Sequence, residues 1–326
     1  MGSVVGAPGN TTWRMFTYKE LYNAANGFSD DNKLGEGGFG SVYWGKTTDG
    51  LEIAVKKLKA MTVKAEMEFA VEVDFLGRVK HKNLLGLRGY RAGTDQRLIV
   101  YYYKPNLSIL SHLHCQFAGD VQLDWKKRMK IVIGSAEGIL SIGVIHMTAC
   151  VKGTLGYLAP GYTMWGKVSK SCDVYSFGIL LLELVTGMKP IEKLPGVKRT
   201  ITEWAEPLLA NGRFKDLVDP KLRGHFDENQ LKQAIYVAAL CVQREPEKRP
   251  NMMQVVGMLK GYDTRGNMMK TRMDSVKYKE ELLEFDQTSG DDDDLEESCG
   301  TFCAMVGINM QDPYSRYGNK KITRHV

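Results

Sequence analysis

Three glycines at G-x-G-x-x-G spacing constrain the fold of this chain more than any other feature. Gly35, Gly37 and Gly40 stand among β-prone residues, and a Thr-Asp-Gly turn at 48–50 precedes a second β-prone run over 51–58. A dinucleotide-binding βαβ unit would need a helix directly after the glycines and an acidic residue about 20 positions later. Here strands flank the glycines on both sides. The pattern therefore predicts a β-hairpin whose backbone, free of Cβ bulk, can close over phosphates.

The second strand of this hairpin carries a lysine beside a small residue. Period-two geometry places Ala54 and Lys56 on one face of the strand and Ile53 and Val55 on the other. An amine on the face that carries the small residue can supply a point charge to the α- and β-phosphate oxygens of a nucleotide.

The next segment, 66–79, has helical periodicity, with Phe69, Val73 and Leu76 on one stripe. Glu72 flanks this stripe, sixteen positions after Lys56. A partly buried lysine needs an anion to hold its orientation, and Glu72 is the candidate.

The glycine hairpin, the Val-Lys pair and the helical glutamate together resemble the small lobe of protein kinases. Further motifs at 81–84 (His-Lys-Asn-Leu), 89–90, 97–103 and 104–108 resemble plant receptor-like cytoplasmic kinases, close to the Pto-interacting type. This resemblance implies that Tyr101 is the gatekeeper and that Tyr102 to Lys104 form the hinge that meets adenine. The ATP-contacting residues that it implies are Leu34, Gly35, Gly37, Gly40, Val42, Ala54, Lys56, Tyr101 and Tyr103.

The C-terminal half resembles the same family. Residues 153–160 resemble the end of an activation segment, and 173–179 resemble the central buried helix of the large lobe. The likeness continues through the rest of the large lobe and covers roughly residues 14–260. It includes Trp204, the helix-ending pair Asp219-Pro220, and the segments 228–241, 249–250 and 252–259.

The resemblance implies an α+β, protein-kinase-like bilobal fold, with a small β-rich N-lobe and a helical C-lobe that is incomplete. Residues 1–13 are expected to be disordered, 14–33 to form a leader helix that a capping box opens at Thr17, and 34–104 to form the N-lobe. We expect the C-lobe over 105–260 and a charged, largely disordered tail over 261–326.

The large lobe departs from the family pattern where phosphoryl transfer is carried out. Kinases of this kind use an Asp in a His-Arg-Asp loop, a nearby Asn, and the Asp of Asp-Phe-Gly to orient the acceptor and hold metal. Between Glu137 and Asp173 this sequence has no Asp, Glu or Asn, and no such motif occurs. Three interpretations of His146 stay open: a remnant of the catalytic-loop histidine, a residue that precedes the threonines of the activation segment, or a surface or packing histidine. The residues at 148–152 favour the second over the first. The family's Ala-Pro-Glu motif reads Ala-Pro-Gly here, with Gly161 in place of the glutamate. By resemblance that glutamate pairs with Arg249 of the large lobe, so Arg249 needs another acceptor.

Three interpretations follow. The first is an active protein kinase that transfers ATP phosphate to protein Ser/Thr or Tyr, which needs another group in place of the absent metal ligands. The second is a pseudokinase that acts as a scaffold in plant signalling. The third is a nonfunctional splice or gene-copy product, because the gap has clean borders on both sides. The sequence disfavours the first and does not separate the other two.

Cofactor and partner expectations follow from the same residues. We expect weak ATP contact without Mg²⁺, contact with signalling kinases or receptor complexes, and Thr148 and Thr154 as possible phosphosites.

Charge and composition bear on partners and location. The net charge is +6, but the basic residues form no tight cluster, which argues against a nucleic-acid partner. Scattered cysteines indicate a reducing, cytoplasmic location, and the longest apolar stretch, 177–185, is too short to span a membrane. Gly2 offers a myristoylation acceptor, but Gly6 stands where Ser or Thr is preferred, which disfavours acylation. Only an acylated chain would lie peripherally at the plasma membrane.

Overall fold

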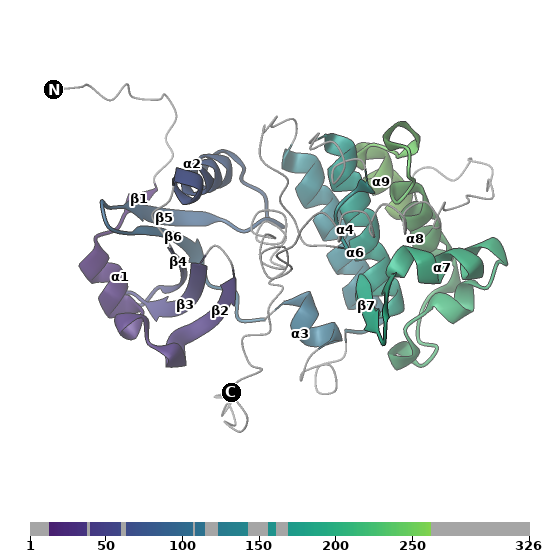
Figure 1. Cartoon of the computed structure of the whole chain (residues 1–326), viewed down its shortest axis with the longest axis horizontal. Coiled ribbons are helices and arrows are strands. Elements are labelled where there is room, and N and C mark those ends of the chain that lie inside the picture. Colours follow the sequence, from purple (N-terminus) through teal and green to yellow (C-terminus); the bar gives the residue numbers. More distant parts are fainter. Residues whose placement is uncertain are drawn as a thin grey trace. The chain divides into compact units, whose positions relative to one another are not determined.

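The computed structural model describes residues 13–37, 40–59, 63–106, 108–114, 123–142, 156–160 and 169–261. These residues divide into two compact units. The small lobe comprises described residues up to Lys80 together with Leu85–Pro105, and the large lobe comprises His81–Leu84 with the described residues from Asn106 onward. The small lobe is built on a β-sheet and the large lobe is mostly helical, as the sequence predicted (Figure 1).

The small lobe contains a six-stranded sheet with the order β1-β5-β6-β4-β3-β2. Its strands are β1 (Arg14–Met15), β2 (Lys33–Gly37), β3 (Gly40–Lys46), β4 (Glu52–Leu58), β5 (Leu87–Ala92) and β6 (Arg97–Tyr102). All neighbours pair antiparallel except β1, which runs parallel to β5. The predicted glycine hairpin is β2 and β3, and β4 follows it in an antiparallel register.

The leader is part of this lobe and does more than form a helix. The Thr17 side chain accepts a hydrogen bond from Glu20 N, and the Glu20 side chain accepts one from the Thr17 backbone, so the predicted capping box opens α1 (Tyr18–Ala24). Phe16, Leu21 and Phe28 are buried against the sheet. The leader thus supplies both a strand and a share of the small-lobe core.

The two helices of the small lobe cover opposite faces of its sheet. The leader packs on the face that carries Ile53 and Val55, both fully buried. Helix α2 (Val63–Arg78) covers the other face, where Phe69 meets the ring of Tyr90 edge to face. Figure 1 shows α1 and α2 lying apart, each against the sheet. The alternation predicted for the Lys56 strand is therefore confirmed.

The large lobe is arranged around α6 (Lys170–Thr186), which is buried along nearly its whole length from Val174 onward. Within the described residues its other helices are α3 (Ile109–Leu113), α4 (Trp125–Ile142), α7 (Ile201–Ala210), α8 (Glu228–Cys241) and α9 (Met252–Leu259). The strands β7 (Ile191–Leu194) and β8 (Val197–Thr200) form a hairpin. Short 3₁₀ turns of this lobe include Pro220–Leu222. None of the helices in the described part of the chain has the length and apolar character that a bilayer span requires.

A buried ion pair ties three segments of the large lobe together. The Arg128 guanidinium of α4 donates to Leu123 O at 2.8 Å, to Leu184 O at 2.9 Å and to Asp219 Oδ2 at 2.6 Å. Both charged side chains are 4% exposed. Because every one of these contacts is made by a desolvated cation, the arrangement fixes where α4 begins relative to the end of α6.

Candidate functional site

The glycine hairpin is held by close backbone packing and by an acidic side chain. A Cβ on Gly40 would lie 2.2 Å from Lys57 O, so only glycine allows β3 to approach β4 this closely. Glu36, between the first two glycines, pairs with Lys33 and, at 3.1 Å, with Lys59. These two lysines lower the pKa of the Glu36 carboxyl. Glu36 thus links the hairpin to its own first residue, Lys33, and to Lys59, which follows β4.

Lys56 and Glu72 form the ion pair that the sequence predicted. Lys56 Nζ donates to Glu72 Oε2 at 2.8 Å, and the two side chains are 12% and 11% exposed. The strand β4 supplies the lysine and the helix α2 supplies the glutamate. A charge-assisted hydrogen bond in a partly desolvated setting fixes the direction of the amine. The lysine is thus presented on the face of β4 that was expected to meet phosphate.

Tyr101 completes this cluster in a way that sequence reasoning missed. Its hydroxyl donates to Glu72 Oε1, so the two carboxylate oxygens serve the lysine and the tyrosine separately. Burial, followed by the charge of Glu72, raises the pKa of Tyr101 well above its ordinary value. The signal that could have found this contact is a tyrosine in a buried strand, whose hydroxyl requires a partner.

The sheet register brings the remaining predicted residues of the small lobe together. Val42 is the cross-strand partner of Lys56, and Ala54 is the partner of Tyr101. The predicted ATP-contacting residues lie on four neighbouring stretches: Leu34, Gly35 and Gly37 on β2, Gly40 and Val42 on β3, Ala54 and Lys56 on β4, and Tyr101 at the end of β6 with Tyr103 just after it. They form one continuous set on the sheet.

Other predicted site residues lie outside the described residues. These are His146, Thr148, Thr154 and Gly161, together with the residues of the N-terminal stretch and the tail. Within the described ranges, no group of three or more His, Cys, Asp or Glu side chains is arranged to hold a metal ion.

Arg249, whose usual carboxylate is replaced by Gly161, has other acceptors. Its guanidinium donates to Gln243 O at 2.6 Å, Ser171 O at 2.9 Å and Arg244 O at 2.9 Å, and it lies 5.0 Å from the centre of the Tyr175 ring. Burial lowers the pKa of this arginine. The described structure therefore accommodates the cation with backbone carbonyls and an aromatic face.

A sheet with a glycine hairpin, a strand lysine paired to a helical glutamate, and a second unit built on a buried helix define a protein-kinase domain. The sequence profile of the protein tyrosine and serine/threonine kinase family matches residues 28–153 and 146–259. The chain belongs to this family, and ATP binding is the property that the family implies.

Several plant kinases are similar to this chain. A PTI1-like tyrosine-protein kinase of Arabidopsis thaliana is 42% identical over 289 residues, covering 76% of this chain and 80% of the relative. Serine/threonine-protein kinase CDG1 of the same species is 37% identical, with 76% and 68% covered. Proline-rich receptor-like protein kinase PERK13 is 36% identical over 95% of this chain, which spans half of that protein's length. The resemblance to Pto-interacting-type kinases is thus confirmed.

Proposed function

We propose that this chain is a nucleotide-contacting pseudokinase that acts by contact with signalling kinases or receptor complexes in the cytoplasm and does not transfer phosphate. The small lobe supports the nucleotide part of this proposal, because Lys56 is oriented by Glu72 beside a glycine hairpin. The sequence of the large lobe supports the inactive part.

The observation that carries the proposal is the run from Gly138 to Cys172, which contains no Asp, Glu or Asn. Phosphoryl transfer in protein kinases depends on positioning and on charge neutralisation by metal ions that carboxylate and amide side chains hold. Without those side chains, neither the acceptor hydroxyl nor the γ-phosphate has a group to orient it. Lys56 alone supplies charge to the α- and β-phosphates and leaves the transferred group unsupported.

The comparisons add support for a missing block. The alignment with the PTI1-like kinase is 289 positions long, whereas 76% of this 326-residue chain is about 248 residues. Several tens of positions of that relative therefore face gaps in this chain. The family profile matches residues 28–153 and 146–259, and the two matches overlap at 146–153. This overlap lies inside the run from Gly138 to Cys172, which contains no Asp, Glu or Asn.

The weakness and metal independence of nucleotide binding follow from the same chemistry. In an active kinase the metal ions bridge the β- and γ-phosphates and carry much of the triphosphate charge. In this chain the hinge, the hairpin and Lys56 would hold the nucleotide without that bridge. Thr148 and Thr154 remain candidate sites at which an upstream kinase adds phosphate.

A thermal-shift titration of the purified chain with ATP, with and without Mg²⁺, tests the proposal. We expect the melting temperature to rise equally in the two series, and we expect Lys56→Met to remove the rise. Lys46→Met, which changes an exposed lysine of the same sheet, is the matched control and should keep it.

A strong dependence of the ATP effect on Mg²⁺ would contradict the metal-independent site and favour an active kinase. Limited proteolysis of the same sample distinguishes a pseudokinase from a nonfunctional splice or gene-copy product. A stable core over residues 14–260 supports the pseudokinase, whereas cleavage throughout the large lobe would identify a nonfunctional product.

A further inference from the structure

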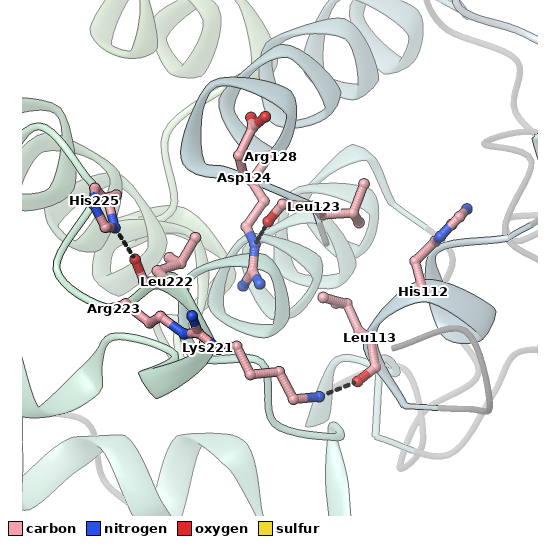
Figure 2. Close-up of a pocket in the computed structure, with 9 residues that line it drawn as sticks. All are labelled: His112, Leu113, Leu123, Asp124, Arg128, Lys221, Leu222, Arg223 and His225. Carbon is pink, nitrogen blue, oxygen red and sulfur yellow. Dashed lines mark hydrogen bonds between the residues drawn. The ribbon is translucent and has the colours of Figure 1, made fainter. Parts of the chain in front are cut away.

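A cavity of about 240 Å³ lies in the large lobe. It is lined by the end of α3, by the residues that begin α4, and by the 3₁₀ turn Pro220–Leu222 with the residues after it (Figure 2). Three leucines form its apolar lining, namely Leu113, Leu123 and Leu222, and each is at most 9% exposed. No part of the proposed phosphate chemistry uses this cavity.

The rim of the cavity is basic. Lys221 and Arg223 are both exposed, and Lys221 Nζ donates one hydrogen bond, to Leu113 O at 3.1 Å. This leaves two N–H groups of the ammonium for another acceptor. His112 and His225 also line the cavity, and each ring donates one N–H to a backbone carbonyl, that of Asn106 and that of Leu222 respectively. The rim therefore offers donors that the described part of the chain does not use.

The acidic groups near the rim are already engaged. Asp219 pairs with the buried Arg128, so this cation and anion compensate each other. Asp124 accepts from Lys127 N at 2.8 Å at the start of α4 and lies 3.6 Å from Lys127 Nζ. The exposed side chains Lys126, Lys127 and Lys130 add positive charge to the first two turns of that helix. The surface around the cavity is thus suited to an anionic ligand.

We propose that this cavity is the docking site for the acidic run of the chain's own tail, residues 291–297 (Asp-Asp-Asp-Asp-Leu-Glu-Glu). The run places six carboxylates around a single leucine, Leu295. That combination matches an apolar floor of three leucines inside a basic rim. Apolar burial would hold the leucine, and the cations of the rim would select an acidic neighbourhood.

The length of the intervening chain fits this occupant. The last described residue, Gly261, follows Lys260, whose Nζ lies 2.7 Å from Glu137 on α4. Since α4 rises 1.5 Å per residue, Glu137 lies about 20 Å from Asp124 at the cavity. Twenty-nine residues separate Gly261 from Asp291, and a coil of that length spans about 30 Å. A tether slightly longer than the span gives a high effective concentration of the acidic run at the cavity.

A fluorescent peptide of residues 288–298 provides the probe. We would measure its binding by anisotropy to the full wild-type chain and to a full chain in which the six acids of 291–297 are changed to Asn or Gln. We expect the tail-neutral chain to bind the peptide at least tenfold more tightly than the wild type, because the wild-type tail competes. Adding Lys221→Glu with Arg223→Glu to the tail-neutral chain should weaken binding at least tenfold.

Two controls keep the test specific. Lys193→Glu with Lys198→Glu makes the same change of charge on the β7–β8 hairpin and should leave the affinity unchanged. Lys221→Met with Arg223→Gln removes the two charges without reversing them. This pair replaces the charge-reversed pair in the binding test if the charge-reversed chain does not show the wild-type circular dichroism spectrum and melting temperature.

The proposal is overturned by any of three results. These are equal peptide affinity for the wild-type and tail-neutral chains, no effect of either pair of substitutions at 221 and 223, or tighter binding of a phosphotyrosine peptide than of the acidic peptide at the same residues. The last result would assign the cavity to a phosphorylated partner.

Discussion

The small and large lobes of this kinase-family chain differ in what each retains. In the small lobe, the glycine hairpin, the strand lysine, the helical glutamate and Tyr101 are in mutual contact or register. In the large lobe, the packing elements are present, with α6 buried and Arg128 paired to Asp219, yet the run from Gly138 to Cys172 contains no Asp, Glu or Asn.

This difference separates folding from chemistry. A helical core depends on apolar side chains spread over many segments, and those segments lie on both sides of the run from Gly138 to Cys172. Phosphoryl transfer depends on a few polar side chains in a single stretch of chain. Loss of one stretch can therefore leave packing largely in place and remove the reaction.

The largest expected effect comes from restoring that stretch. Inserting the catalytic segment of the PTI1-like kinase after Ile142 should raise phosphoryl transfer from background to the range of ~1–100 s⁻¹ that is typical of protein kinases. Transfer of labelled γ-phosphate to the chain itself or to a generic substrate measures this. Lys56→Met in the grafted chain should return the rate to background, and a folded graft that stays inactive would show that the large lobe lacks more than this block.

The next effect tests whether the large lobe is held by its buried ion pair. Arg128→Met should lower the free energy of unfolding by about 3–5 kcal/mol, because it leaves the Asp219 carboxylate buried without its cation. Urea denaturation measures the loss. Adding Asp219→Asn should recover part of it, whereas simple additivity of the two substitutions would mean that the pair does not act as a unit.

A smaller effect is expected where the leader meets the small-lobe sheet. A Cβ on Gly89 would lie 2.0 Å from Arg14 O and 2.8 Å from the Phe16 ring, so Gly89→Ala should displace β1 and cost about 1–3 kcal/mol. Faster hydrogen exchange of the Phe16 amide, which donates to Tyr90 O at 3.0 Å, would report it. Gly257→Ala has no atom within 4 Å of its new Cβ and should leave stability unchanged or improved.

The smallest effect is a loss of stability at high pH that both lobes share. Burial raises the pKa of Tyr101 in the small lobe and of Tyr157 in the large lobe well above 10.0. Above pH 10 the unfolded tyrosines release protons that the folded chain keeps, so stability falls with pH by about 1.4 kcal/mol per unit for each tyrosine. Tyr101→Phe should halve this part of the slope in pH-dependent melting, and Tyr22→Phe, at an exposed position, should not change it.

Much of the small lobe could be predicted because its signals are local. Period-two alternation placed Ala54 and Lys56 on one face, and the capping box at Thr17 located the leader helix. In the large lobe, the segments 228–241 and 252–259, which the family resemblance singled out, are the helices α8 and α9.

The contacts that sequence did not predict join residues far apart in the chain. Tyr101 meets Glu72 across 29 positions, and Arg128 meets Asp219 across 91. The parallel pairing of β1 with β5 is likewise invisible to a pattern read along one segment.

The most direct test of the difference between the lobes measures binding and transfer in one sample. The purified chain would be incubated with γ-labelled ATP in Mg²⁺ or Mn²⁺ beside the Lys56→Met variant, with nucleotide binding followed by filter retention and phosphate transfer by intact mass. The account predicts ATP binding that depends on Lys56 and no phosphorylated protein. Phosphate incorporation that depends on Lys56 would contradict it, because it would show that the large lobe supplies the transfer machinery from other residues.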